Sequence, residues 1–201
     1  MSTTEDDLQP LFRAIAARDF VKSSSLLVAI PALAQQAVHT GEYFLTGVSH
    51  QVYRGDTALH IAAASHLPDL VQALLAAGAH VGAKNRNGAQ PLHYAADGNP
   101  ESEFWSPANQ VAVIERLVSA GADPNAADKR TVTPLHRAVR TRCAGAVRAL
   151  LSCGANPRLV NKNNSTPLLL AVHNTGRAGT GSPAARAQQA LIIGLLQGSN
   201  T

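Results

Sequence analysis

The chain has 201 residues, of which 45% are hydrophobic and only 4% aromatic, which is enough for one domain or two small ones with a buried core. Its 36 alanines and 23 leucines favour helices and argue against a β-sandwich or a β-barrel. The formal net charge of +4 conceals a division: residues 1–128 contain 7 Lys/Arg and 13 Asp/Glu, whereas residues 129–201 contain 10 Lys/Arg and no acid.

The sequence also predicts a compartment. Its beginning, MSTTEDDLQP, has neither the basic start nor the apolar run of a secretion signal, and no apolar stretch reaches the roughly 20 residues that span a bilayer. Cys143 and Cys153, ten residues apart on one predicted helix, are separated by roughly 15 Å, too far for a disulfide. We therefore expect a cytoplasmic protein that does not contact membranes.

The first predicted element in chain order is a helix pair within residues 1–31, which is a degenerate version of the units further along the chain. Residues 32–54 follow, and much of this segment has the composition of extended strands. We expect it to form a lengthened finger loop that carries Tyr43, Phe44 and Tyr53.

From residue 55 onwards, one phrase occurs four times. Its copies are GDTALHIAA (55–63), GAQPLHYAA (88–96), TVTPLHRAV (131–139) and NSTPLLLAV (164–172). A second phrase follows in phase as LLAAGA (74–79), LVSAGA (117–122) and LLSCGA (150–155). Two phrases in register indicate a helical unit that stacks along an axis, so the whole chain is predicted to form one domain. Its full repeats are residues 55–87, 88–130, 131–163 and 164–201.

Each unit has a physical explanation. The threonine in the first phrase can cap a helix, proline fits the first helical turn, and leucine and alanine then recur at helical spacing. Gly78, Gly121 and Gly154 stand where the second helix ends in a left-handed residue. Thr131 occupies a position that is glycine in the two preceding copies. Because a β-branched residue tolerates positive φ poorly, we expect an altered turn before the third full repeat.

These phrases resemble the ankyrin repeat, a unit of about 33 residues with the signature G-x-T-P-L-H-x-A-A … L-L-x-x-G-A. The resemblance is clear over residues 55–201. It implies an all-α, helix–turn–helix solenoid with β-hairpin or finger loops, and a concave face of fingers and inner helices that binds other proteins. At matching positions of this chain, the inner-helix column of that face is Ile61, Tyr94, Arg137 and Leu170.

Two insertions, residues 97–110 and 174–189, flank the basic repeat 131–163. The predicted recognition site for an acidic partner lies between them and consists of Tyr94, Phe104, Trp105, Lys129, Arg130, Arg137, Arg140, Arg142 and Arg177. Two other interpretations stay open, since the arginines can be a solvated face and the aromatic residues can fold back on their own repeat. Pairing of the arginines with Asp97, Glu101 and Glu103 is a further alternative.

Catalysis is not predicted. His60, His93 and His136 recur at the repeat period and are therefore expected to be structural, bonding to turn backbone and the capping residue. The cysteines lack a zinc-ligand spacing, and the chain has no GxSxG motif or phosphate-binding loop. We predict no catalytic residue, no cofactor and no metal site.

The leading functional hypothesis is a non-catalytic protein–protein interaction module that binds an acidic partner on its concave and loop face. The first alternative is nucleic-acid binding through the basic C-terminal repeats, and the second is a small-molecule or enzymatic site between the inserted loops. Self-association is also possible, because the last helix brings together Leu191, Ile192, Ile193, Leu195 and Leu196.

Overall fold

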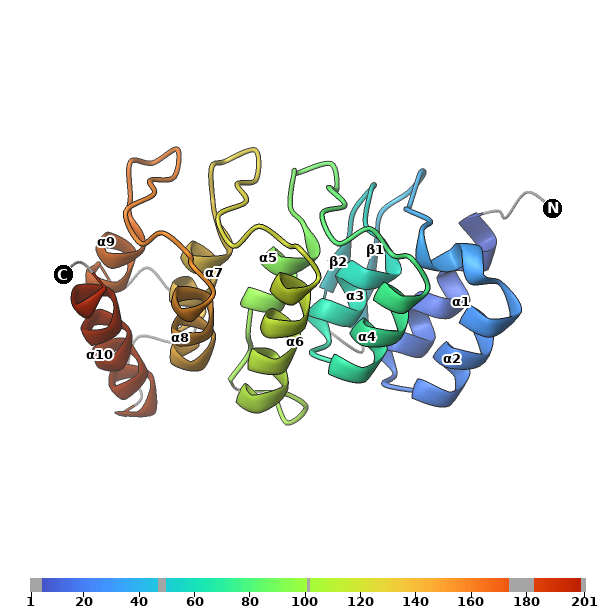
Figure 1. The fold of residues 1–201 in the computed structure, drawn as a ribbon, viewed down its shortest axis with the longest axis horizontal. Helices are drawn as coiled ribbons and strands as arrows, with labels where there is room; N and C mark the ends of the chain where they lie inside the picture. Colours follow the sequence, from blue (N-terminus) through green and yellow to red (C-terminus); the bar gives the residue numbers. More distant parts are fainter. Residues whose placement is uncertain (1–4, 47–49, 101, 174–182, 200–201) are drawn as a thin grey trace.

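Five helix pairs stand side by side along one axis in the computed structural model, which describes residues 5–46, 50–100, 102–173 and 183–199 (Figure 1). The first helices of the pairs form an inner row, which consists of α1 (Glu5–Ala16), α3 (Ala58–Ala64), α5 (Pro91–Ala96), α7 (Pro134–Arg140) and α9 (Pro167–Val172). The outer row consists of α2 (Phe20–Ala29), α4 (Pro68–Ala76), α6 (Pro107–Ser119), α8 (Ala144–Ser152) and α10 (Pro183–Gly198). The predicted helix–turn–helix solenoid is confirmed.

Small residues allow the inner helices to pack closely. Each inner helix contacts the next inner helix, and from α2 onwards each outer helix contacts the next outer helix. Ala62, Ala95 and Ala138 are fully buried at corresponding positions of α3, α5 and α7. An alanine methyl group lets two helix backbones approach, so the apolar core runs continuously along the array.

The recurring histidines have a structural role, as their periodicity predicted, and they also join each repeat to the next. In α3, the ring Nδ1 of His60 accepts a hydrogen bond from the Thr57 backbone N–H at 3.1 Å. With the proton therefore on Nε2, the ring donates to the Ala89 carbonyl of the following repeat at 3.2 Å. The same arrangement connects His93 to Val132 and His136 to Ser165. Each ring thus caps its own helix and fixes the position of the next finger.

The loops that precede α3, α5, α7 and α9 project from one edge of the solenoid, which we call the finger edge (Figure 1). The finger before α7 keeps its turn, because Thr131 adopts a φ of 53°. Asp128 supports this conformation, since its Oδ1 accepts from the N–H groups of Arg130 (2.8 Å) and Val132 (3.0 Å). The expectation of an altered turn was therefore wrong: local hydrogen bonds hold a β-branched residue in the left-handed region.

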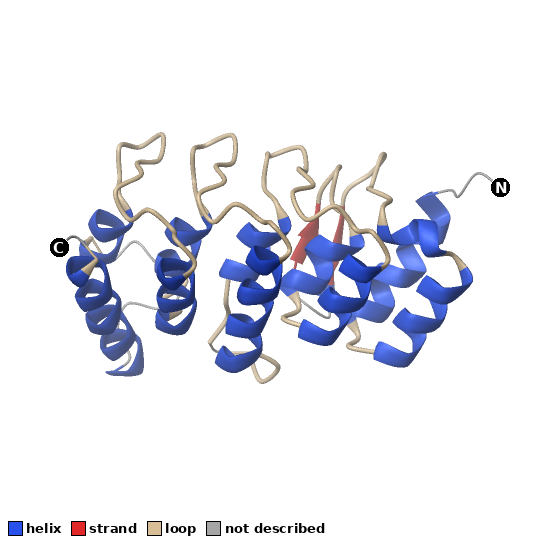
Figure 2. Ribbon diagram, in the orientation of Figure 1, coloured by secondary structure: helices blue, strands red, loops and turns tan. Residues whose placement is uncertain are grey.

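The lengthened first finger contains a β-hairpin, consistent with its strand-like composition. Strands β1 (Tyr43–Leu45) and β2 (His50–Val52) pair antiparallel, with Tyr43 opposite Val52 (Figure 2). Leu45 and Val52 are buried in the apolar core. A 3-10 helix, Pro31–Ala34, connects α2 to this finger.

The C-terminal helix α10 closes the array. Ile192 and Leu196 are buried, whereas Leu191 is 50% exposed and lines a shallow apolar groove beside α8. Helix α10 begins at Pro183, so the second half of the predicted insertion 174–189 is helical and not a loop. Residues 174–182 lie outside the described part of the chain. Among the described residues, no helix combines the length and apolarity that a bilayer span requires.

Candidate functional site

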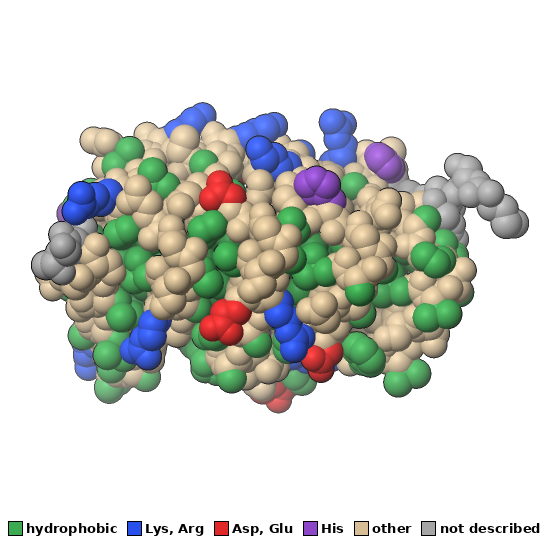
Figure 3. Space-filling view, in the orientation of Figure 1, with side chains coloured by type: hydrophobic (Ala, Val, Ile, Leu, Met, Phe, Trp, Pro, Cys, Tyr) green, Lys and Arg blue, Asp and Glu red, His purple; other side chains and the backbone are tan. Residues whose placement is uncertain are grey.

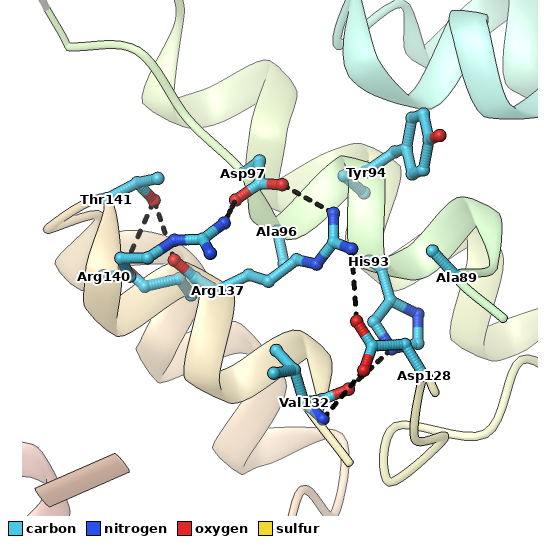
Figure 4. A network of polar contacts seen from close by, with 12 residues as sticks. Ala89, His93, Tyr94, Ala96, Asp97, Asp128, Val132, Arg137, Arg140 and Thr141 are labelled. Atoms are coloured by element: carbon cyan, nitrogen blue, oxygen red, sulfur yellow. Dashed lines mark hydrogen bonds and ion pairs between the residues drawn. The ribbon is translucent and has the colours of Figure 1, made fainter. Parts of the chain in front are cut away.

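Two predicted site residues, Arg137 and Arg140 of α7, meet the carboxylate of Asp97 (Figure 4). Arg137 Nη1 donates to Asp97 Oδ2 at 2.8 Å, and Arg140 Nη2 donates to Asp97 Oδ1 at 3.1 Å. The other terminal nitrogen of Arg137 lies 3.6 Å from Asp128 Oδ2 in the preceding finger. Because Asp97 ends α5, these ion pairs connect the second full repeat to the third.

Asp97 and Asp128 largely neutralise the charges of Arg137 and Arg140, so these arginines attract an acidic partner only weakly. Burial alone raises the pKa of Asp97, but the two guanidinium groups hold this pKa below its ordinary value. Burial alone lowers the pKa of Arg137, which the carboxylate of Asp97 nevertheless raises. The Arg137 side chain is only 15% exposed. An acidic partner would therefore have to compete with Asp97 and Asp128, so the predicted internal pairing is present for Asp97.

Tyr94 was predicted to lie on the binding surface, but its side chain is buried. Its hydroxyl donates to Asp56 Oδ1 at 2.8 Å, and Asn85 Nδ2 donates to the same oxygen at 2.9 Å. The centroid of the His50 ring, from β2, lies 4.5 Å from the centroid of the Tyr94 ring. The hairpin therefore covers this part of the inner-helix column. Ile61 is fully buried as well, so an open concave face at these two positions is excluded.

Arg142 also departs from the prediction. It is only 4% exposed and occupies the turn between α7 and α8 with a φ of 56°. His66 occupies the corresponding turn between α3 and α4 with a φ of 50°. Both side chains are thus part of the packed interior, and Arg142 is not a surface contact.

The inserted loop folds back at its tryptophan. Trp105 is partly buried against the core, and its Nε1 donates to Gln110 Oε1 at 3.2 Å. The amide of Gln110 in turn donates to the Ala95 carbonyl at 3.0 Å. Phe104 remains 55% exposed, and the guanidinium carbon of Arg18 lies 5.9 Å from its ring centroid. The loop therefore reaches back from the second full repeat to the turn between α1 and α2.

The predicted site residues consequently do not form one surface. Lys129 and Arg130 are exposed at a finger tip, whereas Phe104 and Trp105 lie on the loop at the opposite edge (Figure 1). Arg137 and Arg140 belong to the inner helix α7 and are ion-paired with Asp97. Arg177 is outside the described residues.

Other finger residues were missed by the sequence prediction of the site. A row of exposed cations runs along the finger edge, and we call it the cationic ridge: Arg54, Arg86, Lys129, Arg130 and Lys162. Lys and Arg side chains gather along this edge, at the top of Figure 3. A periodic signal was available, because Arg86, Lys129 and Lys162 each stand two residues before the first residue of a repeated phrase.

No arrangement for catalysis or metal binding emerges from the described part of the chain. Within it, no three His, Cys, Asp or Glu side chains are grouped as a metal site requires. Both cysteines are free thiols, and burial raises the pKa of Cys143 to about 11. This thiol therefore stays protonated and unreactive near neutral pH.

Comparison with known proteins agrees with this architecture. The family profile "Ankyrin repeats (3 copies)" matches residues 26–102 and 106–180. The B-cell lymphoma 3 protein homolog of Mus musculus is 36% identical over 91 residues, which cover 45% of this chain and 19% of that protein. Ankyrin repeat and SOCS box protein 16 of Mus musculus is 37% identical over 89 residues, or 44% and 19% of the two chains. The matched segment spans about a fifth of each relative's length. The chain belongs to the ankyrin repeat family.

Proposed function

We propose that this chain is a non-catalytic protein-binding module that recognises an acidic partner through exposed cations of its fingers. Ankyrin repeats are generally protein–protein interaction modules. The observation that carries the choice of partner is the exposure of Lys129 and Arg130, in contrast to the internal ion pairs of Arg137 and Arg140. Charge complementarity at exposed positions accelerates association and selects partners.

Affinity capture from a native cytoplasmic extract tests the proposal. The wild-type chain is compared with a Lys129→Glu, Arg130→Glu variant, and with a matched Arg13→Glu, Lys22→Glu variant whose exposed cations lie on the first helix pair. We expect the finger variant to lose acidic proteins that the wild type and the matched variant retain. An identical set of captured proteins for all three chains would refute the choice of partner.

Nucleic-acid binding through the basic C-terminal repeats is the alternative. Titration with RNA and DNA at several salt concentrations distinguishes the two, because binding through phosphate contacts weakens steeply with salt. The second alternative, a site between the inserted loops, involves residues 174–182, which lie outside the described residues.

Two further sequence predictions belong to this proposal. Self-association would cover the apolar groove at Leu191, and sedimentation at high protein concentration tests it: a dimer supports the prediction and a monomer removes it. A cytoplasmic location stays a prediction from the sequence.

A further inference from the structure

We infer that the cationic ridge binds an extended acidic segment of a partner protein, lying along the finger tips from the first full repeat to the last. This inference rests on the proposed function and specifies its docking surface and the conformation of the bound segment. It also extends the docking surface beyond the predicted site, since Arg54 and Arg86 belong to residues 1–128, the part of the chain with net negative charge.

Backbone hydrogen bonds hold the cations of the ridge in register. The Arg86 N–H donates to the Arg54 carbonyl at 2.7 Å, and the Lys162 N–H donates to the Arg130 carbonyl at 3.0 Å. Between these pairs, the Lys129 N–H donates to the carbonyl of Asn87 at 2.9 Å. Neighbouring finger tips are therefore in contact, and the row of cations is a consequence of the repeat geometry.

Little on the finger edge neutralises this row. Arg86 makes an ion pair with Glu42 at 2.7 Å, while the other four cations of the ridge form no ion pair with any described residue. The nearby carboxylates are already used, because Asp56 is buried beneath the hairpin and Asp128 binds its own turn and Arg137. Like charges held together in this way repel, and a bound anionic chain would relieve that repulsion.

The spacing of the ridge favours an extended polypeptide. Helices stacked in one row are about 10 Å apart, so the column Arg86, Lys129 and Lys162 repeats at about this distance. An extended chain advances about 3.3 Å per residue. An acidic side chain at every third residue would therefore face one finger after another, and about ten residues would span the ridge.

The same surface is poorly suited to single-stranded nucleic acid, which such proteins bind by stacking bases on aromatic rings. The fingers that precede α5, α7 and α9 contain no aromatic residue. In the first finger, Phe44 is exposed, whereas the ring of Tyr53 is covered by the guanidinium of Arg86, whose carbon lies 5.2 Å from the ring centroid. The concave face is not open at the inner-helix positions of the first two full repeats, where Ile61 and Tyr94 are buried and His50 of the hairpin lies against the Tyr94 ring.

Two synthetic peptides of about ten residues test the inference with the full chain at low salt. One carries glutamate at every third position in a Ser/Gly background, and the other has the same composition with its glutamates contiguous. Neutral substitutions divide the ridge into an N-terminal pair, Arg54→Gln with Arg86→Gln, and a C-terminal pair, Lys129→Gln with Lys162→Gln. An Arg13→Gln, Lys22→Gln variant, with both exposed cations on the first helix pair, is the matched control, and unchanged thermal unfolding verifies that each variant is folded.

We expect the spaced peptide to bind more tightly than the contiguous one, and each ridge pair to weaken its binding about fivefold while the control does not. Weakening by the C-terminal pair alone would overturn the inference but leave the proposed function intact. Equal binding of both peptides, or no binding of either, would also overturn it. Tighter binding of a short oligothymidylate than of the spaced peptide would reject the class of partner.

Discussion

Tyr94 and Arg137 occupy the same position of the inner helix in adjacent repeats, yet their surroundings differ. Tyr94 is sealed beneath the hairpin and shares one carboxylate, that of Asp56, with neutral hydrogen-bond donors. Arg137 lies beyond the hairpin and bridges two carboxylates while keeping some exposure. The repeat therefore fixes where a side chain points, and the insertions decide whether that side chain meets solvent.

The comparison also explains why a concave binding face is not continuous along this array. Over α5, His50 of strand β2 lies against the ring of Tyr94 and covers this part of the inner-helix column. Over α7, the arginines are neutralised by Asp97 and Asp128. What remains uniformly available is the finger edge, so partner recognition is expected to shift towards the finger tips.

The largest expected loss of stability comes from disrupting the buried hydrogen bonds around Tyr94. Asp56→Ala removes the acceptor of the Tyr94 hydroxyl, the Asn85 amide and the Tyr53 backbone N–H. The Tyr94 hydroxyl and the part-buried Tyr53 N–H lose this acceptor, and Asn85 Nδ2 keeps only the Tyr94 hydroxyl at 2.7 Å. The free energy of unfolding should therefore fall by about 3 kcal/mol, as measured by urea denaturation. Asp69→Ala is the control, because this side chain is 81% exposed and should change stability by less than about 0.5 kcal/mol. Similar losses for both variants would contradict a sealed network.

A smaller loss of stability is expected at Arg137, which keeps some exposure to solvent. Arg137→Met leaves Asp128 without its ion pair and Asp97 with Arg140 alone, so we expect a loss of about 2 kcal/mol in the free energy of unfolding. Arg140→Met should cost less than half as much, because Arg137 continues to bind Asp97. Equal costs in thermal unfolding would show that the bridge to Asp128 contributes nothing.

Acid should weaken the boundary between the two repeats, and Arg137 contributes to this sensitivity. Burial, followed by the positive charge of Arg137, lowers the pKa of His93 from 6.5 to about 4. Because the folded protein resists protonation of this ring, its contribution to stability is complete above pH 6.5 and is lost as the pH falls towards 4. Arg137→Met should raise the pKa of His93 in an NMR titration and reduce the acid-dependent loss of stability. An unchanged pKa of His93 in the variant would show that the charge of Arg137 does not affect this ring.

Much of the fold could be predicted because it repeats. Capping threonines, the histidines and the small residues recur in phase, so each copy supports the interpretation of the others. The candidate site was less predictable, since burial of Tyr94 depends on the unrepeated hairpin and neutralisation of Arg137 depends on Asp97 in another repeat. Net charges summed over residues 1–128 and 129–201 do not show the column formed by Arg86, Lys129 and Lys162. This column is evident only when residues at the same position of successive repeats are compared.

The smallest expected effect concerns the two fingers that precede Tyr94 and Arg137. Gly88 and Thr131 hold equivalent turn positions with φ values of 76° and 53°. A left-handed conformation costs a non-glycine residue about 1–2 kcal/mol, and the greater freedom of glycine in the unfolded chain offsets part of this difference. Thr131→Gly should therefore stabilise the protein by about 0.5–1 kcal/mol.

The reverse substitution, Gly88→Thr, sharpens this prediction. A Cβ at Gly88 would lie 3.1 Å from the backbone nitrogen of Lys129, so the new side chain would press on the next finger of the ridge in addition to straining its own turn. We expect its destabilisation to exceed the gain from Thr131→Gly, as measured by thermal unfolding. If the two changes were equal and opposite, backbone conformation alone would distinguish the fingers, and contact between finger tips would contribute no stability. A larger loss would show that adjacent tips support one another, as the shared register of the ridge requires.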